Sequence, residues 1–157
     1  GLPASGKTYF AKRFAEKIDA VHLNTDIIRD EMGLRGRYNE KTKQMVYEEL
    51  FDKASEKLGK GRDVILDGTF HKQERRNRVK KLAVEKNKSI YFIRMHAGEN
   101  TVEKRLRERR DYSEADFKVY QQIKMEFEPC NEDHLELWSD KMNTREMIEK
   151  ARHFIYE

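Results

Sequence analysis

The first residues of the sequence combine residue types and a spacing that suit phosphate chemistry. Gly1 to Thr8, GLPASGKT, match the pattern GxxxxGK[ST] of a phosphate-binding P-loop. The two glycines let the backbone curl so that successive N–H groups point inward, Lys7 can reach the β- and γ-phosphates, and Thr8 can offer a hydroxyl to Mg²⁺. We therefore expect a nucleoside triphosphate to be bound by the loop residues Gly1, Pro3, Ala4, Ser5, Gly6, Lys7 and Thr8.

An amphipathic helix is expected directly behind this loop. A helix that begins at Gly6 or Lys7 would direct the positive end of its dipole at the bound phosphates. The apolar residues that follow recur at roughly helical spacing: Tyr9, Phe10, Phe14 and Ile18. This context favours a P-loop over the alternative, a chance glycine-rich turn with a basic residue. A P-loop is also fed by a buried strand, so we expect a short apolar strand upstream of Gly1.

Asp26 and Arg29 follow an apolar segment that ends at Asn24. If a helix starts at Asp26, the spacing of three residues places both side chains on one face of that helix. The carboxylate could then accept the proton of an attacking hydroxyl while the arginine holds the acceptor. The alternative makes Asp26 a plain N-cap and Arg29 a solvated charge. The presence of the P-loop favours the catalytic interpretation.

The run Val64 to Asp67 has the form of a Walker B strand, an apolar strand that ends in an acid. Such a carboxylate helps to hold Mg²⁺, directly or through water. Many strands end in aspartate by chance, so this assignment depends on the P-loop. Thr69 and His71 lie just beyond and could contact the acceptor, although a turn residue and a surface histidine are the simpler interpretations.

Four arginines crowd one stretch of sequence, Val102 to Arg110. At about 100° per residue, Leu106 falls close to the first residue of this stretch, and Arg105 and Arg109 lie just to one side of that apolar seam. These two arginines could lean over a bound phosphate from a lid and stabilise charge in the transition state. Arg107 is expected to point away and to form salt bridges with neighbouring glutamates.

The composition limits the class of protein. The 157 residues fit one domain, and 37% of them are hydrophobic while 39% are charged. No apolar run approaches a membrane span and no signal-peptide pattern is visible, so we expect a cytoplasmic protein without membrane partners. Cys130 is the only cysteine, which excludes an internal disulfide and a cysteine-based zinc site. The net charge of +4 suits phosphate-bearing ligands, but a solvated helix face explains the basic run Arg75 to Lys81 better than a nucleic-acid patch.

Helical patterns alternate with short apolar runs, which predicts an α/β fold with a parallel sheet. Strands are expected at 20–24, 63–66, 89–95 and 135–138, and helices at 40–60, 71–85, 99–110, 113–128 and 144–156, the last with Thr144 as N-cap. A short helix is expected to start at Thr25 or Asp26. Ligands of such sheets bind outside the carboxyl ends of the strands, so Asp26 and Asp67 lie where a site is expected.

Taken together, the runs GLPASGKT, NTDIIRDEM and VILDGTF and the arginine-rich helix resemble the small P-loop kinases that phosphorylate hydroxyls. This branch includes polynucleotide 5′-hydroxyl kinases, zeta toxins and chloramphenicol phosphotransferase, and the resemblance covers nearly the whole chain. It implies one P-loop NTPase domain, residues 1–157, with three α/β/α layers and a helical lid at about 99–128. It also implies five parallel strands in the order 2-3-1-4-5, of which the central strand lies upstream of Gly1.

The resemblance implies ATP and Mg²⁺ as cofactors. Lys7 and Thr8 would bind phosphate and metal, and Asp67 would support the metal. Polynucleotide kinases commonly follow this aspartate with Thr-Asn, whereas Gly68 to His71 stand here. This difference weakens the case for a nucleic-acid acceptor.

The same resemblance makes Asp26 the general base, Arg29 the residue that orients the acceptor, and Arg105 and Arg109 lid arginines. The expected function is transfer of the γ-phosphate of ATP to a hydroxyl of a small molecule or a nucleic-acid end. The alternative is a nucleotide-hydrolysing regulatory switch, but the sequence shows no NKxD-like base reader of a guanine-nucleotide switch. The sequence predicts neither the identity of the acceptor nor the oligomeric state.

Overall fold

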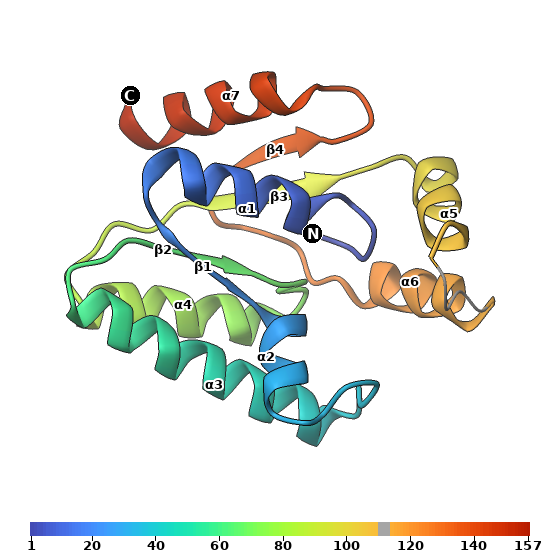
Figure 1. Cartoon of the computed structure of the whole chain (residues 1–157), viewed down its shortest axis with the longest axis horizontal. Helices are drawn as coiled ribbons and strands as arrows, with labels where there is room; N and C mark the ends of the chain where they lie inside the picture. Colours follow the sequence, from blue (N-terminus) through green and yellow to red (C-terminus); the bar gives the residue numbers. More distant parts are fainter. Residues whose placement is uncertain (110–113) are drawn as a thin grey trace. The chain divides into compact units, whose positions relative to one another are not determined.

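The computed structural model describes residues 1–109 and 114–157 of the chain. In these residues seven helices and four strands follow one another (Figure 1). The strands are β1 (Val21–Asn24), β2 (Val64–Asp67), β3 (Phe92–His96) and β4 (His134–Trp138). The helices are α1 (Lys7–Ile18), α2 (Thr25–Glu31), α3 (Glu40–Gly59), α4 (Gln73–Glu85), α5 (Glu99–Arg107), α6 (Glu114–Glu126) and α7 (Thr144–Tyr156).

The chain divides into two compact units. The first unit consists of residues 1–10, 69–74 and 91–157, and it contains the P-loop, β3, β4, α5, α6 and α7. The second unit consists of residues 11–68 and 75–90, and it contains β1, β2, α2 and α3. Helices α1 and α4 have residues in both units. Each unit therefore has its own pair of strands, and the expectation of one domain over residues 1–157 stays a prediction.

In the second unit β1 and β2 run parallel, and their register pairs Val21 with Val64 and Asn24 with Asp67. The long helix α3 contacts both strands and α2. One face of α3 is buried, as its apolar spacing predicts, through Val46, Tyr47, Leu50, Phe51 and Ala54. The register brings the carboxyl ends of the two strands side by side, so Asn24 and Asp67 lie next to each other there.

In the first unit β3 and β4 also run parallel, and their register pairs His96 with Trp138 at the carboxyl ends. Helix α7 contacts β4, and α5 contacts α6. Val102 and Leu106 of α5 form a buried cluster with Tyr120 of α6, and Leu2 and Ala4 of the P-loop pack against this cluster. The P-loop is thus packed directly on the helices that the sequence assigns to a lid.

Both observed strand pairs occur in the sheet order that the resemblance implies. Counting the strand expected upstream as the first, β1 and β2 are its neighbouring strands 2 and 3, and β3 and β4 are its strands 4 and 5. The prediction of an α/β fold with parallel pairing is confirmed. The five-stranded order itself stays a prediction, because the described strands form two separate pairs.

Several boundaries differ from those expected. Strand β3 begins at Phe92 rather than at residue 89, and α4 begins at Gln73 rather than at residue 71. Helix α5 ends at Arg107, where the N–H of Glu108 turns back to carbonyls of the last turn. The expected end of this helix at residue 110 and the expected start of the next at residue 113 lie outside the described residues.

The N-cap of α7 is Asn143, so the prediction of Thr144 is wrong. The side chain of Asn143 accepts a hydrogen bond from the N–H of Glu146 at 2.9 Å, and the carboxylate of Glu146 accepts one from the N–H of Asn143 at 2.9 Å. This reciprocal capping box satisfies two N–H groups at once. A threonine at the next position has no such partner three residues later.

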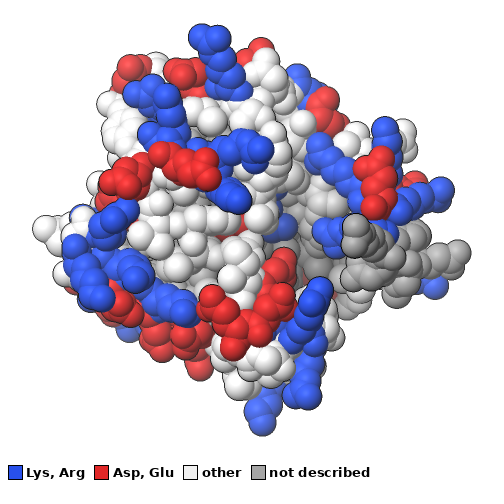
Figure 2. Space-filling view, viewed as in Figure 1, with Lys and Arg blue, Asp and Glu red and all other residues white. Residues whose placement is uncertain are grey.

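Acidic and basic side chains are mixed on the surface that Figure 2 shows, where Asp and Glu lie between Lys and Arg. This mixing matches the near balance of 33 basic and 29 acidic residues. None of the helices in the described part of the chain combines the length and the apolar character that crossing a membrane requires.

Candidate functional site

The glycines of the P-loop lie where the fold leaves no room for a side chain. Gly6 has a φ of 85°, and a Cβ on it would lie 2.9 Å from the Cβ and Oγ of Ser139. A Cβ on Gly1 would lie 2.7 Å from the carbonyl oxygen of Met95. Between them Ala4 also has a positive φ, 57°. The loop is therefore tightly curled and pressed against β3 and the residue after β4, and both glycines of the motif are required sterically.

Two side chains hold the carbonyl groups of this loop from one side. Ser139 donates from Oγ to the carbonyl oxygen of Ser5 at 2.7 Å. Arg105 donates from Nη1 to the carbonyl oxygen of Ala4 at 3.0 Å and to Oγ of Ser139 at 2.9 Å. A trans peptide directs its C=O and the following N–H to opposite sides, so the bond to Ser5 turns the N–H of Gly6 away from Ser139. Such an N–H is the donor that a P-loop offers to phosphate.

Lys7 begins α1 and folds back over its own loop. Its Nζ donates to the carbonyl oxygen of Leu2 at 3.3 Å. Thr8 follows in the first turn of α1 and is exposed. The ammonium group, the hydroxyl group and the N-terminus of a 12-residue helix are thus gathered at one loop. Each of the three favours the binding of a phosphate or of its metal.

The structure places Arg105 and Arg107 as the sequence predicts, one toward the P-loop and one toward solvent, but it does not place Arg109 on α5. Arg105 is half-buried on the P-loop, whereas Arg107 is exposed and pairs with Glu103 one turn earlier. Arg109 lies beyond the end of α5 and is exposed. The expectation that Arg105 and Arg109 share a helical face is wrong, because the helix ends before that face reaches Arg109.

In the second unit the Walker B carboxylate of Asp67 is buried at the end of β2. Its Oδ2 accepts a hydrogen bond from Nδ2 of Asn24 at 2.6 Å and lies 3.0 Å from Nε2 of His22. Both partners belong to β1 and lie two residues apart, so their side chains share one face of the strand. A neutral amide and an imidazole thus fix the position of this carboxylate.

Asn24 also determines where α2 starts. Its Oδ1 accepts hydrogen bonds from the N–H groups of Asp26 at 2.9 Å and Ile27 at 3.0 Å. The alternative that makes Asp26 the N-cap is therefore wrong, since Asn24 is the cap and the helix begins at Thr25. Asp26 lies in the first turn, where the helix dipole stabilises a negative charge.

The prediction that Asp26 and Arg29 share one helix face is confirmed. Nη1 of Arg29 donates to Oδ1 of Asp26 at 2.7 Å. The alternative that Arg29 is a solvated charge is wrong, because Arg29 is only 6% exposed and its guanidinium lies over the ring of Tyr38. The side chain of Asp26 is 72% exposed. A buried arginine therefore holds an accessible carboxylate in place.

His96 and Trp138 form a stacked pair at the carboxyl ends of β3 and β4, with ring centroids 4.7 Å apart. Burial, and next the charge of Arg94, lower the pKa of His96 from 6.5. Nζ of Lys141 lies 4.1 Å from the centroid of the Trp138 ring. Ser139, the residue after this tryptophan, contacts the P-loop.

A family model described as an AAA domain, AAA_33, matches residues 1–130. This chain belongs to that AAA domain family. The match includes the P-loop, Asp26, Arg29 and Asp67 and extends through the arginines of α5.

Solved structures share the fold of this AAA domain. APS kinase CysC of Mycobacterium tuberculosis, in complex with AMPPNP and APS, has a TM-score of 0.77 and 14% identity, with 100% of this chain and 94% of that chain covered. Kti12 of Chaetomium thermophilum, in complex with ADP-AlF3, has a TM-score of 0.72 and 18% identity over 100% and 97% of the two chains. A gluconokinase of Sinorhizobium meliloti 1021 has a TM-score of 0.69 and 14% identity over 96% and 85%. The AAA domain thus has the fold of P-loop kinases.

Curated relatives of the AAA domain are longer proteins. An uncharacterized protein of Mycobacterium tuberculosis (strain ATCC 25618 / H37Rv) is 32% identical over 109 residues, which are 62% of this chain and 22% of that protein. An uncharacterized protein of Mycobacterium bovis matches with the same values. The chain spans about a fifth of the length of the curated relatives it matches.

Sequence reasoning missed three residues of the AAA domain, one that contacts the P-loop in the first unit and two that contact Asp67 in the second. Ser139 carries no motif, and only the fold brings it to a loop at the other end of the chain. His22 and Asn24 had a detectable signal, because polar residues at alternate positions of a short strand share a face. Because β1 pairs with β2 in this register, the face of β1 that carries His22 and Asn24 lies next to the side chain of Asp67.

Proposed function

We propose that this AAA domain is an ATP-dependent kinase that transfers the γ-phosphate to a hydroxyl group of a small molecule or of a nucleic-acid end. The observation that carries the proposal is the pair of Asp26 and Arg29, an exposed carboxylate held at 2.7 Å by a buried guanidinium, in a chain that begins with a P-loop. The kinase fold and the printed names of similar structures, APS kinase and gluconokinase, support it.

The nucleotide part of the reaction belongs to the P-loop. The phosphates would be surrounded by the backbone N–H groups of Gly1, of Ala4–Gly6 and of the first residues of α1. Pro3 has no N–H group to donate. Lys7 would place a positive charge next to the phosphates. This charge lowers the cost of the negative charge that moves toward the leaving group. Gly6 permits the curl, and Ser139 and Arg105 keep the carbonyl groups turned away from the phosphates.

Thr8 and Asp67 are the proposed protein ligands of Mg²⁺. Thr8 would provide a hydroxyl, and Asp67 would provide a carboxylate whose position is fixed by Asn24 and His22. Hard oxygen ligands of this kind suit Mg²⁺, which binds one or two protein groups together with phosphate oxygens. When bound, the ion would neutralise phosphate charge.

Asp26 is the proposed general base. Its carboxylate would accept the proton of the attacking hydroxyl, and Arg29 would keep that carboxylate oriented and contact the acceptor. Arg105 would act through the shape of the P-loop, and Arg109 would contact phosphate as a lid residue. We also expect the protein to act in the cytoplasm and to prefer ATP to GTP.

The decisive experiment measures transfer of labelled γ-phosphate from ATP to a panel of alcohols, sugars, nucleosides and oligonucleotide ends. Asp26→Asn keeps the size of the side chain but removes its basicity, so transfer should fall by about 10²- to 10⁴-fold while ATP affinity is retained. The matched control is Asp30→Asn, an exposed acid on the same helix. ATP hydrolysis without transfer to any acceptor, unchanged in Asp26→Asn, would identify a nucleotide-hydrolysing switch instead.

A further inference from the structure

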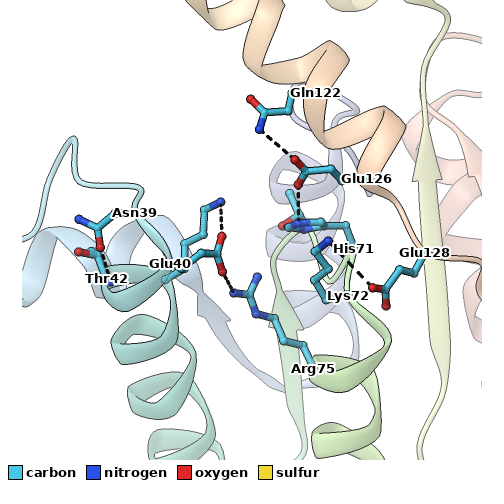
Figure 3. Close-up of polar contacts among 11 residues, drawn as sticks. Asn39, Glu40, Thr42, His71, Lys72, Arg75, Gln122, Glu126 and Glu128 are labelled. Atoms are coloured by element: carbon cyan, nitrogen blue, oxygen red, sulfur yellow. Dashed lines mark hydrogen bonds and ion pairs between the residues drawn. The ribbon is translucent and has the colours of Figure 1, made fainter.

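Two buried arginines of the second unit converge on the segment that leads into α3. Arg29 of α2 is 6% exposed, and its Cζ lies 4.5 Å from the centroid of the Tyr38 ring. Arg75 of α4 is 9% exposed, and its Nη2 lies 3.8 Å from a carboxylate oxygen of Glu40, the first residue of α3 (Figure 3). Because Tyr38 and Glu40 are two residues apart, both guanidinium groups are directed at the same short segment.

The buried position of Arg75 contradicts the interpretation of the run from residue 75 to residue 81 as a solvated face. Arg75 and Arg76 are both buried in the first turn of α4, and Arg78 is the first exposed arginine of this run. Helical spacing did not predict this burial, because α3 supplies aromatic surface for a guanidinium. A charge placed inside the fold needs a counter-charge.

The described residues supply that counter-charge incompletely. Arg29 donates from Nη1 to Asp26, but its buried Nε has no hydrogen-bond acceptor within the described part of the chain. The distance of 3.8 Å between Arg75 and Glu40 is longer than a hydrogen bond. A buried guanidinium N–H without an acceptor, such as Nε–H of Arg29, destabilises the folded state, and an added oxyanion would offer the two arginines further acceptors.

The carboxylates that face the two arginines are easily displaced. The side chain of Asp26 is 72% exposed and that of Glu40 is 79% exposed, whereas the arginines are fixed. Glu40 is also shared, since Lys43 donates to it at 3.2 Å. Because Glu40 is exposed, an anionic ligand can take its place on Arg75 without leaving the buried guanidinium uncompensated.

Aromatic rings keep the guanidinium planes in place. Cζ of Arg75 lies 4.2 Å from the centroid of the buried Tyr47 ring, and Cζ of Arg29 lies against the more exposed ring of Tyr38. A guanidinium that already lies over a ring is restricted in its motion, so little conformational entropy is lost when its fork of N–H groups binds an oxyanion. The N-terminus of the 20-residue helix α3 adds a positive potential at the same segment.

We propose that Arg75, together with Arg29, forms a binding site for an oxyanion carried by the phosphate acceptor. The ligand is a carboxylate or phosphate group on the molecule whose hydroxyl reacts, and Glu40 occupies its place on Arg75 in the protein alone. The identification of the ligand as the phosphate acceptor rests on the proposed kinase function, whereas the oxyanion site itself does not. It makes the substrate class hydroxy acids or phosphorylated alcohols rather than neutral alcohols.

The first test is binding, observed at the arginines themselves. The Nε–Hε signals of ¹⁵N-labelled protein are followed by NMR during separate titrations with inorganic phosphate, malonate and, as a neutral control, glycerol. The signals of Arg29 and Arg75, assigned by their loss in Arg29→Gln and Arg75→Gln, should shift and saturate with at least one anion. The signal of Arg78, an exposed arginine of the same helix, should not saturate. Because the readout is local, phosphate bound at the P-loop does not affect the interpretation.

Glu40→Gln provides a second variant for the case in which Arg75→Gln does not fold. It changes an exposed side chain and removes the competing carboxylate, so the anion that binds should bind about three- to tenfold more tightly. Unchanged or weaker anion binding by Glu40→Gln, or shifts of Arg29 and Arg75 that grow linearly and no more than that of Arg78, would overturn the proposal.

The second test measures labelled phosphate transfer to matched pairs: D-gluconate with D-glucitol, and glucose 6-phosphate with glucose. The charged member of at least one pair should react with a kcat/KM about tenfold higher or more, and Arg78→Gln should preserve that ratio. Equal rates within both pairs would overturn the oxyanion site while the kinase function stands. Saturable anion binding without transfer to any compound would leave the oxyanion site established and count against the kinase function.

Discussion

Arg105 donates a hydrogen bond to the carbonyl oxygen of Ala4 at 3.0 Å, across 101 positions of sequence. The same nitrogen bonds to Ser139, which in turn holds the carbonyl oxygen of Ser5. A helix expected to form a lid therefore contributes an arginine to the shape of the nucleotide loop. This contact gives Arg105 a role that does not depend on a bound phosphate.

Arg105→Ala should weaken nucleotide binding, whereas Arg107→Ala should not. Removing the guanidinium leaves the carbonyl oxygen of Ala4 without this donor, and an unsatisfied buried group costs roughly 1–3 kcal/mol. Part of that cost should appear as an affinity for AMPPNP lower by about tenfold, measured by calorimetry. Arg107 is exposed and forms an ion pair with Glu103 of its own helix, so it is the matched control. If Arg105→Ala bound AMPPNP as tightly as Arg107→Ala, the P-loop would not need the hydrogen bond from Arg105.

Arg109→Ala should separate affinity from transfer. Arg109 is exposed beyond α5, so its removal should change neither AMPPNP affinity nor the free energy of unfolding. If it contacts phosphate in the transition state, kcat should fall by about tenfold or more. A kcat within about twofold of wild type would remove Arg109 from the reaction.

Lys7→Ala should leave the fold intact and remove most of the affinity for triphosphate. A charge-assisted hydrogen bond contributes roughly 1.5–3 kcal/mol, so the dissociation constant for AMPPNP should rise by about tenfold or more. Lys12→Ala, an exposed lysine of the same helix, is the control and should bind as wild type does. Retained affinity and turnover in a folded Lys7→Ala protein would contradict the assignment of the P-loop.

The sequence predicted the elements well where local signals determine them. The P-loop, the long helix expected at residues 40–60 and the i,i+3 pair of Asp26 and Arg29 depend on short-range signals, and the structure agrees with each. It failed where a partner distant in sequence decides the outcome. Arg75 is buried because Tyr47 offers it a ring, and Ser139 reaches the P-loop only because β4 ends beside it.

The end of α5 shows a different limit. Periodicity continues the helical face past Arg107, since nothing in the run of charged residues there marks a stop. The chain nevertheless turns at Glu108, whose N–H bonds back to the carbonyl groups of Lys104 and Leu106. Boundaries of this kind shift by one or two residues at small energetic cost, which is why sequence patterns locate them poorly.

Stability should fall as the pH is lowered through the titration of His96. Its pKa is lowered from 6.5 in the folded protein, chiefly by burial, so the unfolded chain takes up the proton first. The stabilising contribution is therefore present above about pH 6.5 and is lost as the pH falls through the folded value. Urea unfolding from pH 8 to pH 5 should show a smaller decline for His96→Gln than for wild type. Parallel declines would show that another group controls this range.

Asn24→Ser should reduce stability without removing the helix cap. Serine also accepts hydrogen bonds as an N-cap, but it cannot donate to Asp67 as the amide does at 2.6 Å. Loss of this buried bond should lower the free energy of unfolding by about 1–3 kcal/mol, measured by urea denaturation. Saturating Mg²⁺ with AMPPNP should recover part of the loss if Asp67 supports the metal. No recovery would argue against that role.

The amide of Asn24 joins two tasks in one rigid group. One end starts the helix that carries Asp26, and the other end holds the carboxylate of Asp67, so neither acid can shift without the other. Variation during evolution is restricted accordingly, because a substitution at residue 24 that moves the carboxylate of Asp67 also moves the start of the helix that carries Asp26. Acceptor preference, by contrast, can change at Arg75 and Glu40 without disturbing this coupling. New substrates would therefore be acquired at the start of α3, while residue 24 stays fixed.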